Sequence, residues 1–352
     1  MMLTSRANIQ AASRWFLVVS TLISCIYGQI AAGDFSAAES IEFDDTPLNQ
    51  DLILPDWFKL SFLELKTDVA EAKAAGKWGI IVYFGRKDCP YCKAHLEKNW
   101  ADRGIVTYTR KHFDVIGIDV RGDRSVTDEN GKYFKTEKDY AANLRTNFTP
   151  SFLFIDNNGQ TALRLTGYHP PYQFKAILEF VADKHYLYEP LRSFFARGEI
   201  VAGLEESELT DSPIFSRPPY NLNRTKKAGK TPLVVFFEEP TCHSCNVLHR
   251  GPLKNKDILS KFGKLEVVQL DRTQDTPVVT PSGKKTTAKK WAESLGLYYS
   301  PTLIFYDEKG KEILRVDSVI RFYRLNGLLD YILTKGYLEY DTFQLWRHSK
   351  KR

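Results

Sequence analysis

The sequence contains two copies of one pattern, and this internal repeat constrains the fold more than any other feature of the chain. A Cys-x-x-Cys pair at Cys89 and Cys92 recurs 153 residues later at Cys242 and Cys245. Further matches follow at offsets of 152 and then 151 residues: Asp119 with Asp271, Gly131 with Gly283, Pro150 with Pro301, Gly159 with Gly310, and Tyr186 with Tyr337. A chain of 352 residues has room for two domains of roughly 150 residues each. The repeat therefore predicts two copies of one domain.

Strands and helices are predicted to alternate within each copy. Apolar runs such as residues 79–84 are typical of buried strands, and residues 157–159, Asn-Asn-Gly, are typical of a hairpin turn. In the first copy we expect helices at 57–77, 90–100, 138–147 and 172–184, and strands at 79–84, 113–120, 151–156 and 162–165. In the second copy we expect strands at 233–237, 265–271, 302–307 and 312–316, and helices at 242–249, 287–295 and 325–335. This order predicts an α/β fold in which each copy is a central mixed β-sheet flanked by helices.

Each cysteine pair falls at the junction between a predicted strand and a predicted helix. The N-terminus of a helix presents unpaired N–H groups and a partial positive charge, which stabilise a thiolate. Cys89 and Cys242 are therefore the candidate nucleophiles. Cys92 and Cys245 lie one turn later, close enough to attack a mixed disulfide and release the product. These four cysteines are the predicted catalytic residues.

A proline follows the first cysteine at a similar distance in both copies, at Pro150 and Pro301. We expect both prolines to be cis and to face the cysteine pair. Their backbone, with Thr149 and Ser300 just before them, would then hydrogen-bond an extended substrate peptide. These four residues are the predicted substrate-binding residues.

This order of elements, with Cys-x-x-Cys after a strand and Thr-Pro or Ser-Pro before a hairpin, resembles the thioredoxin arrangement. Residues 119–123, 149–154, 164–168 and 300–305 are similar to the SoxW group of thioredoxin-related proteins, which are found with bacterial sulfur-oxidation genes. The resemblance covers nearly everything after Pro55. It implies two thioredoxin-like domains in tandem.

The resemblance also implies a function. A protein of this kind is a periplasmic oxidoreductase that exchanges electrons with protein thiols and disulfides, without a cofactor, and is supplied with electrons by a membrane transporter. We expect the reductive direction, with a link to sulfur oxidation or cytochrome maturation by association. The alternative is a non-enzymatic, chaperone-like module that binds proteins in the proline groove.

The chain departs from the thioredoxin pattern near the cysteines. Many thioredoxins have a buried aspartate six residues before the first cysteine, which serves proton transfer during exchange, but here those positions are Tyr83 and Phe236. Proton transfer must therefore differ or pass through water. His95 and His249, on the predicted active-site helices, are expected at the surface.

Composition disfavours other classes of protein. The formal net charge of +6 is modest and comes partly from the last few residues, so we predict no nucleic-acid partner. The gap between the two cysteine pairs is far longer than in zinc ribbons, so we predict no metal site.

The N-terminal residues are typical of an export signal. Arg6 and Arg14 precede an uncharged run that ends at Gly33. Cys25 lies in a sequence similar to a bacterial lipobox and is a candidate lipidation site; cleavage after Ala32 or Gly33, or a retained anchor, are the alternatives. All three predict a protein outside the cytoplasm that contacts a membrane only through its leader or a lipid. The expected divisions are a leader at 1–33, a linker at 34–54, domain 1 at 55–196, a linker at 197–229, domain 2 at 230–346 and a basic tail at 347–352.

Overall fold

The computed structural model describes residues 41–200 and 208–350, with the side chains of 198–200 left out. The expected leader, including Cys25, lies outside the described residues, as does part of the expected linker at 197–229. Both repeats belong to one compact unit. Among the helices that the structure describes, none combines the length and apolar character needed to span a membrane.

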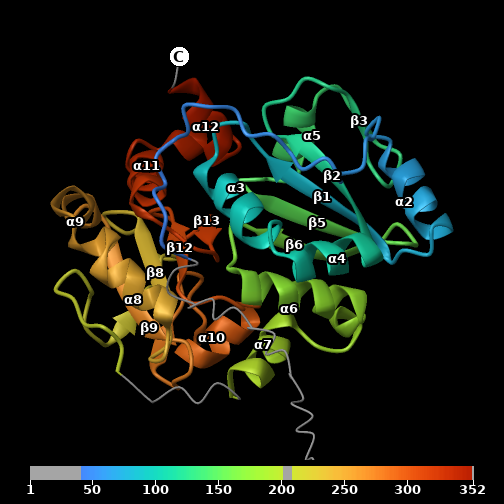
Figure 1. The fold of residues 1–352 in the computed structure, drawn as a ribbon. Helices are drawn as coiled ribbons and strands as arrows, with labels where there is room; N and C mark the ends of the chain where they lie inside the picture. Colours follow the sequence, from blue (N-terminus) through green and yellow to red (C-terminus); the bar gives the residue numbers. More distant parts are fainter. Residues whose placement is uncertain (1–40, 201–207, 351–352) are drawn as a thin grey trace, which may run out of the picture. The chain divides into compact units, whose positions relative to one another are not determined.

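The first repeat is built on a four-stranded mixed sheet in the order β2-β1-β5-β6 (Figure 1). Its strands are β1 (Gly79–Gly85), β2 (Phe113–Asp119), β5 (Ser151–Asp156) and β6 (Thr161–Thr166). Strand β1 pairs in parallel with β2 and antiparallel with β5, and β5 pairs antiparallel with β6. Its helices are α2 (Leu65–Ala74), α3 (Pro90–Ala94), the π-helical turn η1 (His95–Asn99), α4 (Arg103–His112), α5 (Glu137–Asn143) and α6 (Pro171–Ala182).

Alternation along β1 explains why helices cover both faces of this sheet. Successive strand residues point to opposite faces. Ile81 and Tyr83 belong to one core, together with residues of α3, α4 and α6. Ile80 and Val82 belong to another core, together with residues of α2 and α5. Because both faces are buried, the strand is a continuous apolar run in the sequence.

The second repeat has the same strand order, β9-β8-β12-β13, with the same directions. Its strands are β8 (Leu233–Glu238), β9 (Glu266–Asp271), β12 (Thr302–Tyr306) and β13 (Glu312–Val316). Its helices are α8 (His243–Arg250), the short η3 (Pro252–Lys254), α9 (Lys256–Phe262), α10 (Ala288–Ser294), α11 (Phe322–Leu333), the short η4 (Gly336–Leu338) and α12 (Phe343–Ser349). Val234 and Phe236 of β8 face the core formed with α8, α9 and α11, whereas Val235 and Phe237 face the core formed with α10.

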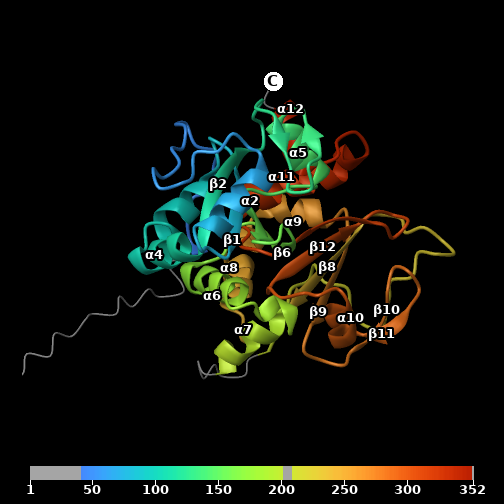
Figure 2. The same cartoon turned by 90° about the vertical axis from the view of Figure 1, so that its right-hand side faces the viewer.

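Smaller elements complete both repeats. Strands β3 (Val126–Thr127) and β4 (Tyr133–Phe134) form a two-stranded sheet in the first repeat. Strands β7 (Tyr220–Asn221), β10 (Pro277–Val279) and β11 (Lys285–Thr287) form a small sheet beside α10 in the second (Figure 2). The remaining helices are η2 (His185–Leu187) and α7 (Leu191–Ile200).

Two segments differ from the sequence-based expectations. The helix expected over 57–77 begins only at Leu65, because Leu63 adopts a left-handed backbone conformation with φ 62°. Trp57 instead makes an edge contact with Trp100, with ring centroids 5.5 Å apart. Part of the segment expected to link the domains packs on the second repeat, where the buried Arg224 donates to Glu266 Oε2 at 2.7 Å.

Candidate active site

Both cysteine pairs cap the start of a helix. Cys89 lies just before α3 and Cys242 just before α8. In each pair the sulfur of the first cysteine accepts a hydrogen bond at 3.0 Å from the backbone N–H of the second, Cys92 or Cys245. The pairs are joined as disulfides, with Cα atoms 5.1 and 5.2 Å apart. This is the helix N-terminal environment that favours a thiolate when the disulfide is reduced.

The expected cis prolines are present at Thr149-Pro150 and Ser300-Pro301. In the first repeat Thr149 Oγ1 lies 3.2 Å from the sulfur of Cys89, so the structure brings a predicted substrate-binding residue to a predicted nucleophile. In the second repeat Ser300 Oγ accepts from Arg272 Nη1 at 3.0 Å. The roles of these residues in binding substrate stay predictions.

The two sites differ in accessibility. Cys89 and Cys92 each expose 1% of their surface, whereas Cys242 exposes 6% and Cys245 exposes 5%. A disulfide partner must reach the sulfur of the first cysteine directly, because exchange proceeds by attack along the S–S axis. What covers Cys89 therefore decides how the first site can work.

Arg324, in the first turn of α11, packs against Tyr91 and Thr149 of the first site, and we call it the cover of this site. Its Nη2 donates to the backbone oxygen of Thr149 at 2.7 Å, and its guanidinium carbon lies 3.2 Å from the ring centroid of Tyr91, inside the Cys89–Cys92 motif. Burial lowers the pKa of Arg324 to about 10, so the side chain remains charged at neutral pH. A cation from the second repeat thus occupies the backbone oxygen that we expected to bind substrate.

Asp45, from the segment expected to be a linker, holds this arrangement together. Its carboxylate accepts from the Tyr91 hydroxyl at 2.9 Å and from the backbone N–H groups of Tyr323 and Arg324 at 2.8 Å each. Burial raises the pKa of Tyr91 well above its usual value, so its hydroxyl stays protonated and can donate. Asp45 therefore caps α11 and ties it to the first motif.

Each proline loop also places an apolar residue in the core of the other repeat. Phe148, two residues before Pro150, packs in the core of the second repeat. Its counterpart Tyr299 packs in the core of the first and donates from its hydroxyl to Ser244 Oγ at 3.1 Å, inside the second motif. Each active-site loop is thus held partly by the other repeat.

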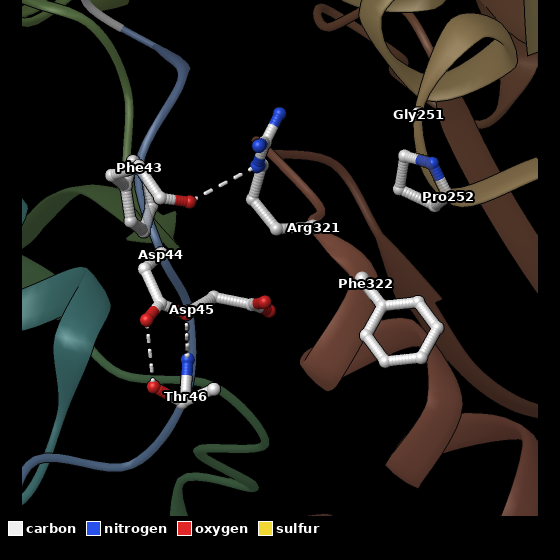
Figure 3. Close-up of a pocket in the computed structure, with 8 residues that line it drawn as sticks. All are labelled: Phe43, Asp44, Asp45, Thr46, Gly251, Pro252, Arg321 and Phe322. Carbon is white, nitrogen blue, oxygen red and sulfur yellow. Dashed lines mark hydrogen bonds between the residues drawn. The ribbon is translucent and has the colours of Figure 1, made fainter. Parts of the chain in front are cut away.

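A cavity of about 200 Å³ lies beside the contact between Asp45 and the start of α11 (Figure 3). The close-up shows the chain from Phe43 to Thr46 facing Arg321 and Phe322, with Gly251 and Pro252 to the right of these two residues. Arg321 Nε donates to the backbone oxygen of Phe43 at 3.2 Å. None of the four motif cysteines is among the residues that line this cavity.

The expectation that His95 and His249 lie at the surface is wrong. His95 is fully buried, and burial, helped by His169, holds the pKa of His95 well below its usual value. Its Nδ1 lies 2.9 Å from Asn99 Nδ2 and accepts a hydrogen bond from it. His249 exposes 4% and is paired with Glu238. Both histidines follow a motif cysteine by one helical turn, which places them on the buried face of the helix.

Sequence reasoning also missed Asp45, Arg324 and Glu238, which lie outside the repeated motifs. Within residues 41–200 and 208–350, no group of three or more His, Cys, Asp or Glu residues is arranged to hold a metal ion.

Comparisons with known proteins bear on the family. Among solved structures, a thioredoxin-fold protein from Helicobacter pylori is 22% identical, with 49% of this chain and 98% of that chain covered and a TM-score of 0.30. A thioredoxin from Thermus thermophilus is 26% identical, with 34% and 83% covered and a TM-score of 0.27. A disulphide isomerase from Xylella fastidiosa Temecula1 is 18% identical, with 42% and 98% covered and a TM-score of 0.24. A search of curated proteins found no match.

A family model described as a thioredoxin-like domain matches residues 65–182 and again residues 219–333. These matches confirm the predicted pair of thioredoxin-like domains of the α/β class. Since together they span more than half of its length, the chain belongs to the thioredoxin-like domain family and carries that domain twice.

Proposed function

We propose that this protein is a thiol-disulfide oxidoreductase that exchanges electrons with the disulfides and thiols of other proteins. The observation that carries the proposal is the position of each cysteine pair, bonded as a disulfide at a helix N-terminus. A reduced pair at such a position has a first sulfur that ionises readily and a second within reach of it.

The reaction follows from this position. The thiolate of Cys242 attacks a substrate disulfide, forms a mixed disulfide and releases one substrate sulfur as a thiolate. Cys245 then attacks the sulfur of Cys242, the Cys242–Cys245 bond forms, and the second substrate sulfur leaves. Two electrons have passed to the substrate, and a dithiol of another protein must reduce the pair again. We take this reductive direction as the working hypothesis.

We further propose that the second pair meets external substrates first. The greater exposure of Cys242 supports this, as does the contact of Arg324 with Thr149 at the first site. Exchange at Cys89 then requires the first turn of α11 to move away from Tyr91.

The protein-binding alternative has less support. A module that binds chains in the proline groove needs the backbone of Thr149 to be available, but Arg324 occupies its oxygen. Binding without exchange would therefore be restricted to the second repeat.

We also propose that the protein works in the periplasm, in the manner of SoxW-like proteins, with electrons from a membrane transporter and a link to sulfur oxidation or cytochrome maturation. The sequence of the leader supports export, and Cys25 is the proposed lipid attachment site. Labelling with a radioactive fatty acid of cells that make the wild-type and Cys25→Ala chains tests this: a lipidated protein carries the label, and the Cys25→Ala chain does not.

Reduction of insulin disulfides by dithiothreitol tests the enzymatic proposal. The wild-type chain is expected to accelerate insulin precipitation, Cys245→Ser to lose most of the acceleration, and Cys92→Ser to keep most of it. A wild-type chain that precipitates insulin no faster than dithiothreitol alone, yet binds unfolded insulin chains, would favour the binding module instead.

A further inference from the structure

A buried ionisable pair lies beside the second motif. Glu238, the last residue of β8, exposes 1% of its surface, and His249 lies on α8. His249 Nε2 lies 3.0 and 2.9 Å from the two carboxylate oxygens of Glu238. Gln269 Nε2 donates to Glu238 Oε2 at 2.7 Å. Burying two ionisable groups is costly unless they are paired and hydrogen-bonded, so the pair needs an explanation.

The backbone places this pair close to Cys245. His249 follows Cys245 by four residues on α8, so the two side chains share a face with Cβ atoms roughly 5–6 Å apart. Side chains on a helix lean toward its N-terminus, which directs the His249 ring back over the turn that holds Cys245. Glu238 is four residues before Cys242, at the end of the strand that leads into the motif.

The hydrogen bond to Glu238 sets the chemistry of the ring. Nε2 donates to the carboxylate, so Nδ1 is the nitrogen left to accept a proton. A carboxylate that holds one ring nitrogen also stabilises the imidazolium that forms when the other is protonated. The pair is therefore arranged as a proton acceptor.

The surroundings of the pair contain few other charges. Gln269 from β9 and Phe215, whose ring centroid lies 5.9 Å from that of His249, pack against it, and neither titrates. Arg272, just after β9, donates through its backbone N–H to the backbone oxygen of Glu238, while its guanidinium donates to Ser300 and to the backbone oxygen of Leu297.

We infer that His249, positioned by Glu238, accepts the proton of the Cys245 thiol when Cys245 attacks the mixed disulfide. The inference rests on the proposed function and assigns a route for the proton at a site where Phe236 fills the position six residues before Cys242. The proton passes from Cys245 to Nδ1 of His249, directly or through one water. The Cys242–Cys245 bond forms, the Cys242–substrate bond breaks, and the departing thiolate or solvent later takes the proton.

The first repeat provides an internal comparison. The residues that correspond to Glu238 and His249 are Gly85 and Leu96, so the first repeat has no equivalent pair. The buried histidine on its active-site helix is His95, one residue before the position that corresponds to His249, and Nδ1 of that ring already accepts a hydrogen bond from Asn99. The two sites therefore differ in how a proton can leave the second cysteine.

Dithionitrobenzoate, a chromogenic disulfide, provides a test at the second site alone. In a reduced Cys25→Ala/Cys89→Ser/Cys92→Ser chain, attack by Cys242 releases one coloured thiolate, and attack by Cys245 releases the other. Stopped-flow absorbance separates the two releases between pH 4 and 8. The parent chain is compared with chains that also carry His249→Leu, the residue of the first repeat, or Glu238→Gln, which keeps the size and an acceptor for Nε2.

The second release is expected to be fast at pH 7 in the parent, because His249 takes the proton of Cys245. His249→Leu is expected to slow it about ten- to a hundred-fold at pH 7 and to make it rise with pH, because the proton must then go to solvent. Glu238→Gln is expected to have a smaller effect in the same direction. As a control, His249→Leu in a Cys25→Ala/Cys242→Ser/Cys245→Ser chain should leave the releases at the first site unchanged.

Coinciding pH profiles for the parent and His249→Leu would overturn the inference. If His249→Leu does not fold, a Glu238→Gln profile identical to that of the parent would do so. Absence of the second release in the parent would instead refute the proposed function at this site.

Discussion

Replacing Arg324 by alanine is expected to open the first cysteine pair to reagents. In the structure its guanidinium covers Tyr91 and binds the backbone oxygen of Thr149, the residue whose hydroxyl lies beside the sulfur of Cys89. Alanine removes both contacts but keeps the backbone N–H of residue 324 that binds Asp45. The helix start should therefore survive while the cover is lost.

The size of the effect follows from opposing contributions. A hydrogen bond from a charged group contributes about 1.5–3 kcal/mol, and a desolvated cation–π contact about 2 kcal/mol. Burial of the charge, which lowers the pKa of Arg324 to about 10, opposes them by about 3 kcal/mol. A net loss of about 0.5–2 kcal/mol remains, which corresponds to a roughly 2- to 30-fold larger population of the open form.

Alkylation rates measure that population. The reduced protein is treated with iodoacetamide, and modification of Cys89 and Cys242 is followed by mass spectrometry. Cys89 should react roughly 2- to 30-fold faster in Arg324→Ala than in the wild type, whereas Cys242 should keep its rate. Tyr323→Ala is the matched control, because the adjacent Tyr323 side chain is 40% exposed. An unchanged Cys89 rate in a folded Arg324→Ala chain would refute the assigned cover.

Three further predictions concern stability, each read from urea unfolding. Asp45→Ala should lower the free energy of unfolding by about 2–4 kcal/mol, because it leaves buried donors unpaired. Asp44 is exposed and is bonded to Thr46, so Asp44→Ala should change the free energy of unfolding little. Equal effects of the two substitutions would contradict this prediction. Burial lowers the pKa of His169 to about 4. The contribution of the neutral His169 to the free energy of unfolding is therefore fully present above pH 6.5 and should fall by up to about 3 kcal/mol as the pH drops to 4. His169→Gln should make the free energy of unfolding depend less on pH in this range, and a slope equal to that of the wild type would contradict the prediction. Gly167→Ala should destabilise the protein, because Gly167 has φ 84° and an added Cβ would collide with Ser318. A neutral effect would show that Ser318 can move aside.

The repeat and its spacing were sufficient to predict the fold, the helix-capping cysteines and the cis prolines. These features are local, because a strand, a helix start and a turn each depend on neighbouring residues. The same pattern also occurs at matching positions in both repeats, which strengthens each prediction. The apolar runs of β1 and β8 were visible for the same reason, since both faces of each sheet are covered.

The cover of the first site could not be predicted in this way. Asp45 and Arg324 are 279 residues apart and meet only after both repeats have folded. The counterpart of Arg324 in the first copy is Gln173, so the repeat does not mark it. His249 could have been found, because its four-residue spacing from Cys245 places it on the buried face of α8.

The most direct test of the account is the redox equilibrium of the second pair. A Cys89→Ser/Cys92→Ser chain is equilibrated with glutathione buffers of graded potential, quenched with acid and alkylated. Mass spectrometry then gives the fractions of the reduced and oxidised Cys242–Cys245 pair. The account predicts that Cys242 and Cys245 titrate reversibly as one two-electron couple, with a tenfold change in the equilibrium ratio for about 30 mV. A pair that stays oxidised in every glutathione buffer and also in excess dithiothreitol would be a structural disulfide and would contradict the proposed function.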